Sequence, residues 1–507
     1  MSSPLSLRRI GAVIAAGALL VSLAACAPPA STTADDGGTL RIAVPGSTAD
    51  SIDPHFTRGT SADVVRYRQL FDGLTELDGT GQLRYMLAES ITSNDDATVW
   101  TIKLRDGVKL HSGRQFVADD VIATIDRIIA PDSTAVGKSQ ISFIPEDGIK
   151  KIDDLTVEVT LDKPYGPFAQ VWTNKYLKMV PADFDPAKPD GTGPFVYQTF
   201  TAGQSSTFTR NADYWDGAPK VAEVVITDFA DNEAAINALK GGQVDIAYSV
   251  PLNEAPALET TSGVKILNSP SDLYINLAMR TDVAPFDDPR VREAFRLIAD
   301  RQEMVDVALN GYGVVANDYV GRYSSCGDPD VPQREQDIDK AKALLAEAGQ
   351  SNLSIELATV NGTAGMVEAA QVFAEQAAKA GITVTAKTYE EAAYLENQGN
   401  WTFAVDFFSG PYLQLAARTL LPGGSANETH WDDATYNALA AEAFATADDA
   451  ARCQVELKMK EVEYQSGGNI IWGFVNRLSA YSDAVKGLQE DSTGEGAARI
   501  NDVTIEH

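Results

Sequence analysis

Cysteine and histidine are scarce in this chain. Its 507 residues include three Cys and four His, too few for a disulfide-rich scaffold or a four-cysteine metal site. The four histidines (His55, His111, His430 and His507) are far apart in sequence. Direct metal coordination is therefore disfavoured, and we expect no metal site and no cofactor.

Positive charge is also in short supply. The chain has 41 Lys and Arg against 71 Asp and Glu, a formal net charge of −30. Such an acidic protein is a poor candidate for binding the phosphate backbone, so we expect no nucleic-acid partner. Six Trp, 17 Tyr and 18 Phe exclude disorder throughout the chain.

Sequence motifs of catalysis are missing as well. The chain has no G-x-S-x-G, phosphate-binding loop, H-E-x-x-H or C-x-x-C motif. Residues 311–316 match a loose dinucleotide fingerprint, but residues 291–309 before them have helical spacing where that fingerprint needs a strand. Neighbouring acids such as Asp119 and Asp120 do not face each other on a helix or strand. We therefore expect a protein that is not an enzyme.

The amino terminus predicts export. Two arginines precede an uncharged apolar stretch at 10–25, which is the order of a secretory signal and is shorter than a membrane-spanning helix. The stretch ends in Leu-Ala-Ala before Cys26 and resembles the lipobox of bacterial lipoproteins. This resemblance implies removal of residues 1–25 and lipidation of Cys26, and the alternative is a soluble secreted protein. Residues 26–38 predict a flexible tether.

Strand and helix patterns alternate along the rest of the chain. Alternation of apolar and polar residues predicts strands at 39–44, 100–104 and 157–161. The turn signal Asp106-Gly107 follows the second of these, and the strand pattern resumes at 108–110. Apolar residues with helical spacing predict helices, which are expected at 117–129, 291–309 and 338–348.

A crossover unit is predicted in the second half. Residues 353–359 have a strand pattern, 366–380 have an amphipathic helix pattern ended by Gly381, and 382–387 have a strand pattern again. A strand, a helix and a strand at this spacing predict a parallel pair, and hence an α/β lobe.

Two cysteines remain if Cys26 is lipidated. Outside the cytoplasm two thiols usually pair, so we expect a disulfide between Cys326 and Cys453, with two separate buried thiols as the alternative.

A series of short motifs covers most of residues 39–500. They are Ser-Ile-Asp-Pro (51–54), Phe-Asp-Gly-Leu (71–74), the Trp-Thr-Ile-Lys-Leu stretch (100–113) with Ala-Asp-Asp-Val (118–121), Gly-Thr-Gly-Pro-Phe (191–195), Arg-Asn-Ala-Asp-Tyr-Trp (210–215), Gly-Gly-Gln-Val-Asp (241–245), the Pro-Phe-Asp-Asp-Pro stretch (285–294) and the Ala-Lys-Ala-Leu-Leu stretch (341–349). Together and in this order they resemble the extracellular solute-binding proteins of family 5, which serve peptide and nickel ABC importers. We interpret most of them as scaffold.

The resemblance implies an α/β, two-lobed periplasmic-binding-protein fold with two hinge strands and an extra domain in the first lobe. The ligand would lie between the lobes, which close over it. Carried onto this chain, the first lobe comprises 39–72, 187–268 and 476–507, its extra domain 73–186, and the second lobe 269–475. The hinge crossings are expected at 274–276 and 474–476.

Peptide-binding members of the family pair an Asp with the peptide's α-ammonium. The matching stretch here is 408–411, in which Phe408 takes the place of a Trp and Pro411 that of the Asp, which puts free-amine recognition in doubt. Asp406 could substitute if its side chain faced the cleft; otherwise it would lie on the outer face of its strand. The ligand-binding residues predicted in this way are Asp406, Phe407, Phe408, Ser409, Gly410, Asn427, His430, Trp431 and Phe474.

We therefore expect a monomeric, lipid-anchored receptor on the outer face of the cell membrane. It would capture a small solute, with peptides as the leading class, and deliver it to an ABC permease. An opine-like solute, a sugar-like solute or a chelated metal is the alternative within the binding class. A surface enzyme or an adhesin-like interaction protein is the rival from another class.

Overall fold

The computed structural model describes residues 37–57, 59–322 and 325–506. The predicted signal, Cys26 and most of the predicted tether lie outside these described residues. Strands and helices alternate along the described part and build three larger sheets, which confirms the α/β class. No helix of this part is long and apolar enough to cross a bilayer.

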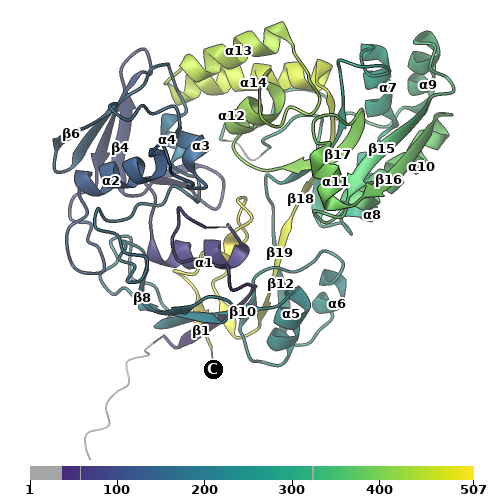
Figure 1. Ribbon diagram of the computed structural model, residues 1–507. Helices are drawn as coiled ribbons and strands as arrows, with labels where there is room; N and C mark the ends of the chain where they lie inside the picture. Colours follow the sequence, from purple (N-terminus) through teal and green to yellow (C-terminus); the bar gives the residue numbers. More distant parts are fainter. Residues whose placement is uncertain (1–36, 58, 323–324, 507) are drawn as a thin grey trace, which may run out of the picture. The chain divides into compact units, whose positions relative to one another are not determined.

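The first sheet has seven strands in both orientations. In spatial order they are β12 (Val264–Ser269), β19 (Arg477–Ser482), β11 (Ile246–Ala247), β1 (Thr39–Pro45), β10 (Glu223–Phe229), β9 (Ser205–Arg210) and β8 (Phe195–Thr201). Helices α1 (Ser61–Leu70), α5 (Asn232–Lys240) and α6 (Ala255–Glu259) pack on it (Figure 1). Successive β1 residues point to opposite faces: Ile42 packs in the cluster that contains α1, and Ala43 packs with α5.

The second sheet has six strands and is covered on both faces. In order they are β14 (Gly313–Val315), β18 (Asn469–Val475), β13 (Tyr274–Met279), β17 (Phe403–Phe408), β15 (Ser354–Val360) and β16 (Thr383–Tyr389). One face packs against α7 (Pro289–Ile298), α8 (Arg301–Ala308), α9 (Ile338–Glu347) and α10 (Met366–Lys379). The other packs against α12 (Tyr412–Leu415), the π-helical turn η1 (Ala416–Leu420), α13 (Ala434–Ala445) and α14 (Asp449–Ser466). Every residue of β13 and β18 is buried, as expected for strands with both faces covered.

A separate antiparallel sheet is formed by residues from the first half of the chain. Its strands are β4 (Ala88–Ser93), β5 (Val99–Leu104), β7 (Thr156–Thr160) and β6 (Ile149–Asp153). Helices α2 (Ala118–Ile129), α3 (Lys138–Ile141) and α4 (Phe168–Val171) share its hydrophobic core. The smaller elements are β2 (Thr75–Leu77), β3 (Leu83–Tyr85), α11 (Glu391–Glu396), β20 (Val485–Lys486), the 3₁₀ turn η2 (Gly496–Ala498) and β21 (Thr504–Ile505).

The strongest sequence patterns predicted their elements well. The strand expected at 39–44 is β1, and the crossover unit is β15, α10 and β16, with β15 and β16 parallel as predicted. The helix expected at 338–348 is α9.

Two local predictions were wrong. The strand pattern at 108–110 does not continue β5 across a hairpin, because β5 pairs with β4 and β7, and only a single bridge joins Lys109 to Gln115. Residues 291–309 form two helices rather than one. The chain breaks at Asp300, whose side chain caps α8 by accepting a hydrogen bond from the backbone N of Glu303 at 3.0 Å.

Candidate functional site

The chain crosses between the two large sheets twice. It leaves the first sheet after β12 and enters the second at β13, and it returns from β18 to β19 through Asn476 (Figure 1). The two crossings are bonded to each other: Ser271 Oγ donates to the backbone O of Val475 at 2.7 Å, and Val475 N donates to the backbone O of Leu273 at 2.7 Å. The first crossing therefore comes just before Tyr274.

Both sheets turn the carboxyl ends of parallel strands toward these crossings. In the first sheet, β1 is parallel to β10 and β11, and the antiparallel β19 begins beside the ends of these strands. In the second sheet, β15 is parallel to β16 and β17, and Tyr274 at the start of β13 pairs with Phe408 at the end of β17. Ligands of open α/β sheets bind beyond the carboxyl ends of the strands. The crossing edge is therefore the candidate solute site.

Two hollows in the structure lie elsewhere. A cavity of ≈ 260 Å³ is bounded by the end of α1, by β2 and β3 and by the carboxyl-terminal segment, and its wall contains the ion pairs Arg84–Asp216 and Arg499–Asp491. A shallower hollow of ≈ 510 Å³ lies at the start of α7. Each is formed on one side of the crossings alone, whereas both sheets contribute to the crossing edge.

Residues 407–410, predicted to bind the ligand, lie at this edge because they end β17 or follow it directly. These residues differ in solvent exposure. The side chain of Phe407 is 38% exposed, and Ser409 is also exposed. Phe408 points to the other face, where its ring lies 6.0 Å from that of Tyr274 and the guanidinium of Arg418 covers it at 5.2 Å. Phe408 is therefore a core residue.

Phe474, also predicted as a ligand contact, is a core residue. Its side chain is 1% exposed, and its ring packs edge-on against Tyr274 at 6.4 Å. The residue ends a strand at the crossing, as its position suggested, but the side chain faces the helices that cover the sheet.

Asp406 is buried rather than open to a ligand. It is 5% exposed, and its carboxylate accepts hydrogen bonds from Nε2 of Gln398 at 3.1 Å and from the backbone N of Phe407 at 2.7 Å. Glu428 faces it. Burial, followed by the hydrogen bond to Asp406 and its charge, raises the pKa of Glu428 to about 9. At neutral pH Glu428 is therefore protonated and donates to Asp406. Asp406 is therefore buried and hydrogen-bonded, rather than on an outer face of its strand.

Asn427, His430 and Trp431 lie at the opposite end of the second sheet. β13 runs from the crossing at Tyr274 to Met279, about 17 Å along the strand. Just beyond that far end, Thr281 N donates to Thr429 O at 2.8 Å, and His430 contacts Asp282 and the backbone O of Gly399.

The side chains of this segment have structural contacts. Asn427 Nδ2 donates to the backbone O of Trp431 at 3.1 Å, and the Trp431 ring packs against Tyr436. Asn427, His430 and Trp431 therefore lie away from the crossing edge, because closeness in sequence to β17 did not place them at its carboxyl end.

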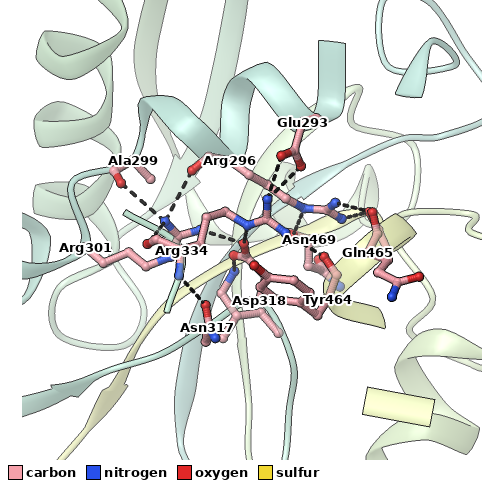
Figure 2. A network of polar contacts seen from close by, with 12 residues as sticks. Glu293, Arg296, Ala299, Arg301, Asn317, Asp318, Arg334, Tyr464, Gln465 and Asn469 are labelled. Atoms are coloured by element: carbon pink, nitrogen blue, oxygen red, sulfur yellow. Dashed lines mark hydrogen bonds and ion pairs between the residues drawn. The ribbon is translucent and has the colours of Figure 1, made fainter. Parts of the chain in front are cut away.

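Residues 317, 318 and 334, in the segment between β14 and α9, belong to a buried network of charges (Figure 2). Asp318 accepts hydrogen bonds from Arg301 Nη2 at 2.6 Å and Arg334 Nε at 2.8 Å, and Arg334 also pairs with Glu293 at 2.7 Å. Burial would raise the pKa of Asp318, but Arg301, Arg334 and Arg296 outweigh it and lower this pKa. The network stabilises the scaffold of the second sheet.

The same segment carries Cys326. In the structure it forms a disulfide with Cys453 of α14, with a Cα–Cα distance of 4.8 Å. The described residues contain no group of three or more His, Cys, Asp or Glu side chains that could hold a metal ion.

The comparisons with known proteins agree with this architecture. The profile of the bacterial extracellular solute-binding proteins, family 5, matches residues 82–419. The glutathione-binding protein GsiB of Escherichia coli (strain K12) is 27% identical over 450 residues, which are 84% of this chain and 86% of that protein.

Solved structures show the same fold. HbpA2 from Haemophilus parasuis superposes with a TM-score of 0.81 at 22% identity, covering 93% of this chain and 100% of that chain. The binding protein DppA from Helicobacter pylori, in complex with the peptide STSA, has a TM-score of 0.71 at 23% identity, covering 93% and 98%. With the two sheets, their double crossing and this match over most of its length, the chain belongs to the bacterial extracellular solute-binding proteins of family 5.

Proposed function

We propose that this protein captures peptides at the crossing edge and delivers them to its permease. The protein is a solute-binding receptor of an ABC importer, and its relatives are binding proteins rather than enzymes. The observation that carries the proposal is that two sheets turn the carboxyl ends of their parallel strands toward one pair of crossings. The peptide class is supported by GsiB, which by its name binds glutathione, and by DppA with its bound peptide.

Closure is the mechanism by which such a receptor would retain its solute. Two short crossings can act as hinges when they absorb backbone rotation. We propose that the bodies that close are the lobes predicted from the sequence, with residues 269–475 moving against 39–268 and 476–507. The protein acts as a monomer in this proposal.

A non-peptide solute is the second candidate. Pro411 stands where peptide-binding relatives have the ammonium-binding Asp, and the Asp406 carboxylate is already engaged by Gln398, Phe407 N and Glu428. A peptide would therefore be recognised without ammonium capture by either residue. An opine-like or sugar-like solute or a chelated metal needs no such capture.

Calorimetric titration tests these alternatives. The wild-type protein is titrated with glutathione, with a panel of di- to pentapeptides, and with the amino-acetylated form of each. We expect micromolar or tighter binding of at least one peptide, with equal affinity for its acetylated form. If no peptide binds while an opine, a sugar or Ni(L-His) does, the second candidate replaces the first.

Lipid anchoring is a separate part of the proposal, supported by the Leu-Ala-Ala sequence before Cys26. We expect the Cys26→Ala variant to appear in the culture medium while the wild-type protein sediments with membranes. Ser22→Ala, in the same segment, is the matched control and should remain on the membrane. Membrane retention of the Cys26→Ala variant would place the anchor elsewhere.

A further inference from the structure

Two positive side chains, one directly after the second crossing and one after α4, have no acidic partner. Arg477 is the first residue of β19, directly after the second crossing, and Lys175 follows α4. In the described part of the chain neither has a carboxylate oxygen within 4 Å.

The electrostatics show that these two cations belong to one cluster. Burial lowers the pKa of Lys175; Glu495 opposes this effect, and Arg477 and Arg68 add to it. Burial would raise the pKa of Glu495, but Arg68, Lys175 and Arg477 outweigh it and lower this pKa to about 2.

Glu495 is already engaged within this cluster. Its Oε2 lies 2.6 Å from Nη2 of Arg68. The neighbouring acids are engaged as well, because Glu76 and Asp491 both pair with Arg499. Lys175 and Arg477 therefore carry the surplus positive charge of the cluster.

Two phenol groups lie in the same electrostatic environment. The pKa values of Tyr176 and Tyr248 are raised, first by burial and then by Glu495, and Arg477 opposes the shift in both. Both hydroxyls are therefore protonated and able to donate. Neither makes a hydrogen bond to another described residue, and neither is sealed from solvent. Tyr248 directly follows β11, at the carboxyl edge of the first sheet.

The backbone around this cluster is shaped to fit two of its side chains. A Cβ on Gly494 would lie 2.5 Å from Cδ of Arg477 and 2.9 Å from Cβ of Ser271. A Cβ on Gly59 would clash with the hydroxyl of Tyr176. Both glycines have a positive φ, +74° for Gly494 and +70° for Gly59, which residues with a side chain adopt only with strain. The stem of Arg477 and the ring of Tyr176 are thus held closely against the backbone.

We infer that Lys175 and Arg477, with the hydroxyls of Tyr176 and Tyr248, form a subsite for a carboxylate group of the captured solute. The inference rests on the proposed function, because it places the solute at the crossing edge. It adds the chemical class of the solute, which is an organic acid. A peptide would be held by its own carboxylate group rather than by its ammonium group. Such a group would supply the negative charge that the surplus cations lack.

The test compares acids with their amides. Trialanine, with a free or an amidated carboxyl terminus, and glutathione, with both of its carboxyl groups free or both amidated, are titrated calorimetrically into the wild type, Lys175→Gln and Arg477→Gln. We expect amidation to weaken binding to the wild type by about 10- to 150-fold, the range for a charge-assisted hydrogen bond. Each variant should bind the free acid more weakly by a similar factor and should largely lose the preference for acid over amide. Lys188→Gln, which changes an exposed lysine away from the crossings, should behave as the wild type.

Equal binding of acid and amide by the wild type, or a full acid preference in both variants, would overturn the inference. Circular dichroism melting curves establish that the variants are folded. If no peptide binds, the peptide assignment fails. Mass spectrometry of the solute that co-purifies with the protein then tests separately whether the subsite binds a carboxylate. A non-peptide acid whose retention requires Arg477 would support it. A solute without a carboxylate, or no bound solute of any kind, would count against it.

Discussion

The carboxylate of Asp72 accepts a hydrogen bond from Nε1 of Trp215 at 2.9 Å, across 143 positions of sequence. The same carboxylate accepts from the hydroxyls of Thr192 and Tyr214, each at 2.9 Å. These residues come from three of the motifs that resemble the family, at 71–74, 191–195 and 210–215. The motifs therefore meet in one buried polar network, away from the crossing edge, and this explains how they can be shared by proteins with different ligands.

Removal of this carboxylate should destabilise the fold. In the Asp72→Ala variant three buried or half-buried donors lose their acceptor, and an unsatisfied buried group costs about 1–3 kcal/mol. We expect the free energy of unfolding to fall by about 3 kcal/mol, measured by urea denaturation with tryptophan fluorescence. Asp213→Ala, which removes an exposed carboxylate in the same motif, should change it by no more than about 0.5 kcal/mol. Equal stabilities of the two variants would contradict the role of Asp72.

The disulfide gives a second prediction. A bond between Cys326 and Cys453, 127 positions apart, restricts the unfolded chain, and the entropy of closing such a loop corresponds to about 4–5 kcal/mol as an upper value. Peptide mapping without reductant should find the two cysteines joined. The Cys326→Ser, Cys453→Ser double variant should unfold at lower urea concentration than the wild type. Two thiols that are freely alkylated in native, unreduced protein would contradict the pairing.

Elements with strong local periodicity were predictable from the sequence. The unit formed by β15, α10 and β16 was predicted because apolar residues change from period two to period 3.6 and back within one stretch. The turn at Asp106-Gly107 is present, but the strand expected after it was wrong, because a turn signal is local whereas the partners of β5 are set by distant strands.

The site was less predictable, because its chemistry depends on residues far apart in sequence. The resemblance located the end of β17, but it could not show that Glu428 would cover Asp406 from a loop 22 positions later. Nor could any spacing show that Lys175 and Arg477 act on the same carboxyl group, Glu495, since the two are 302 positions apart in sequence. One sequence signal was available: in the resemblance Pro411 takes the place of an Asp, which put recognition of a free amine in doubt.

The buried pair of Asp406 and Glu428 predicts a specific pH dependence of stability. Glu428 keeps its proton in the folded state up to about pH 9, whereas the ordinary value for a glutamate is 4.5. Because its folded pKa is raised, this group contributes most to stability below pH 4.5, and the contribution is lost as the pH rises toward 9. Over that range the slope for one group is about 1.4 kcal/mol per pH unit.

Replacing Glu428 with Gln should remove this dependence. The Gln amide can donate to Asp406 as the protonated acid does, but it does not ionise in the unfolded chain. In urea denaturation at pH 5, 6, 7 and 8, we expect the Glu428→Gln variant to gain stability relative to the wild type by about 2–3 kcal/mol between pH 5 and pH 7. Glu442→Gln, an exposed position on α13, should follow the wild-type curve. Parallel curves for Glu428→Gln and wild type would show that Glu428 titrates as an ordinary carboxyl group and that Asp406 holds its hydrogen bonds without a shared proton.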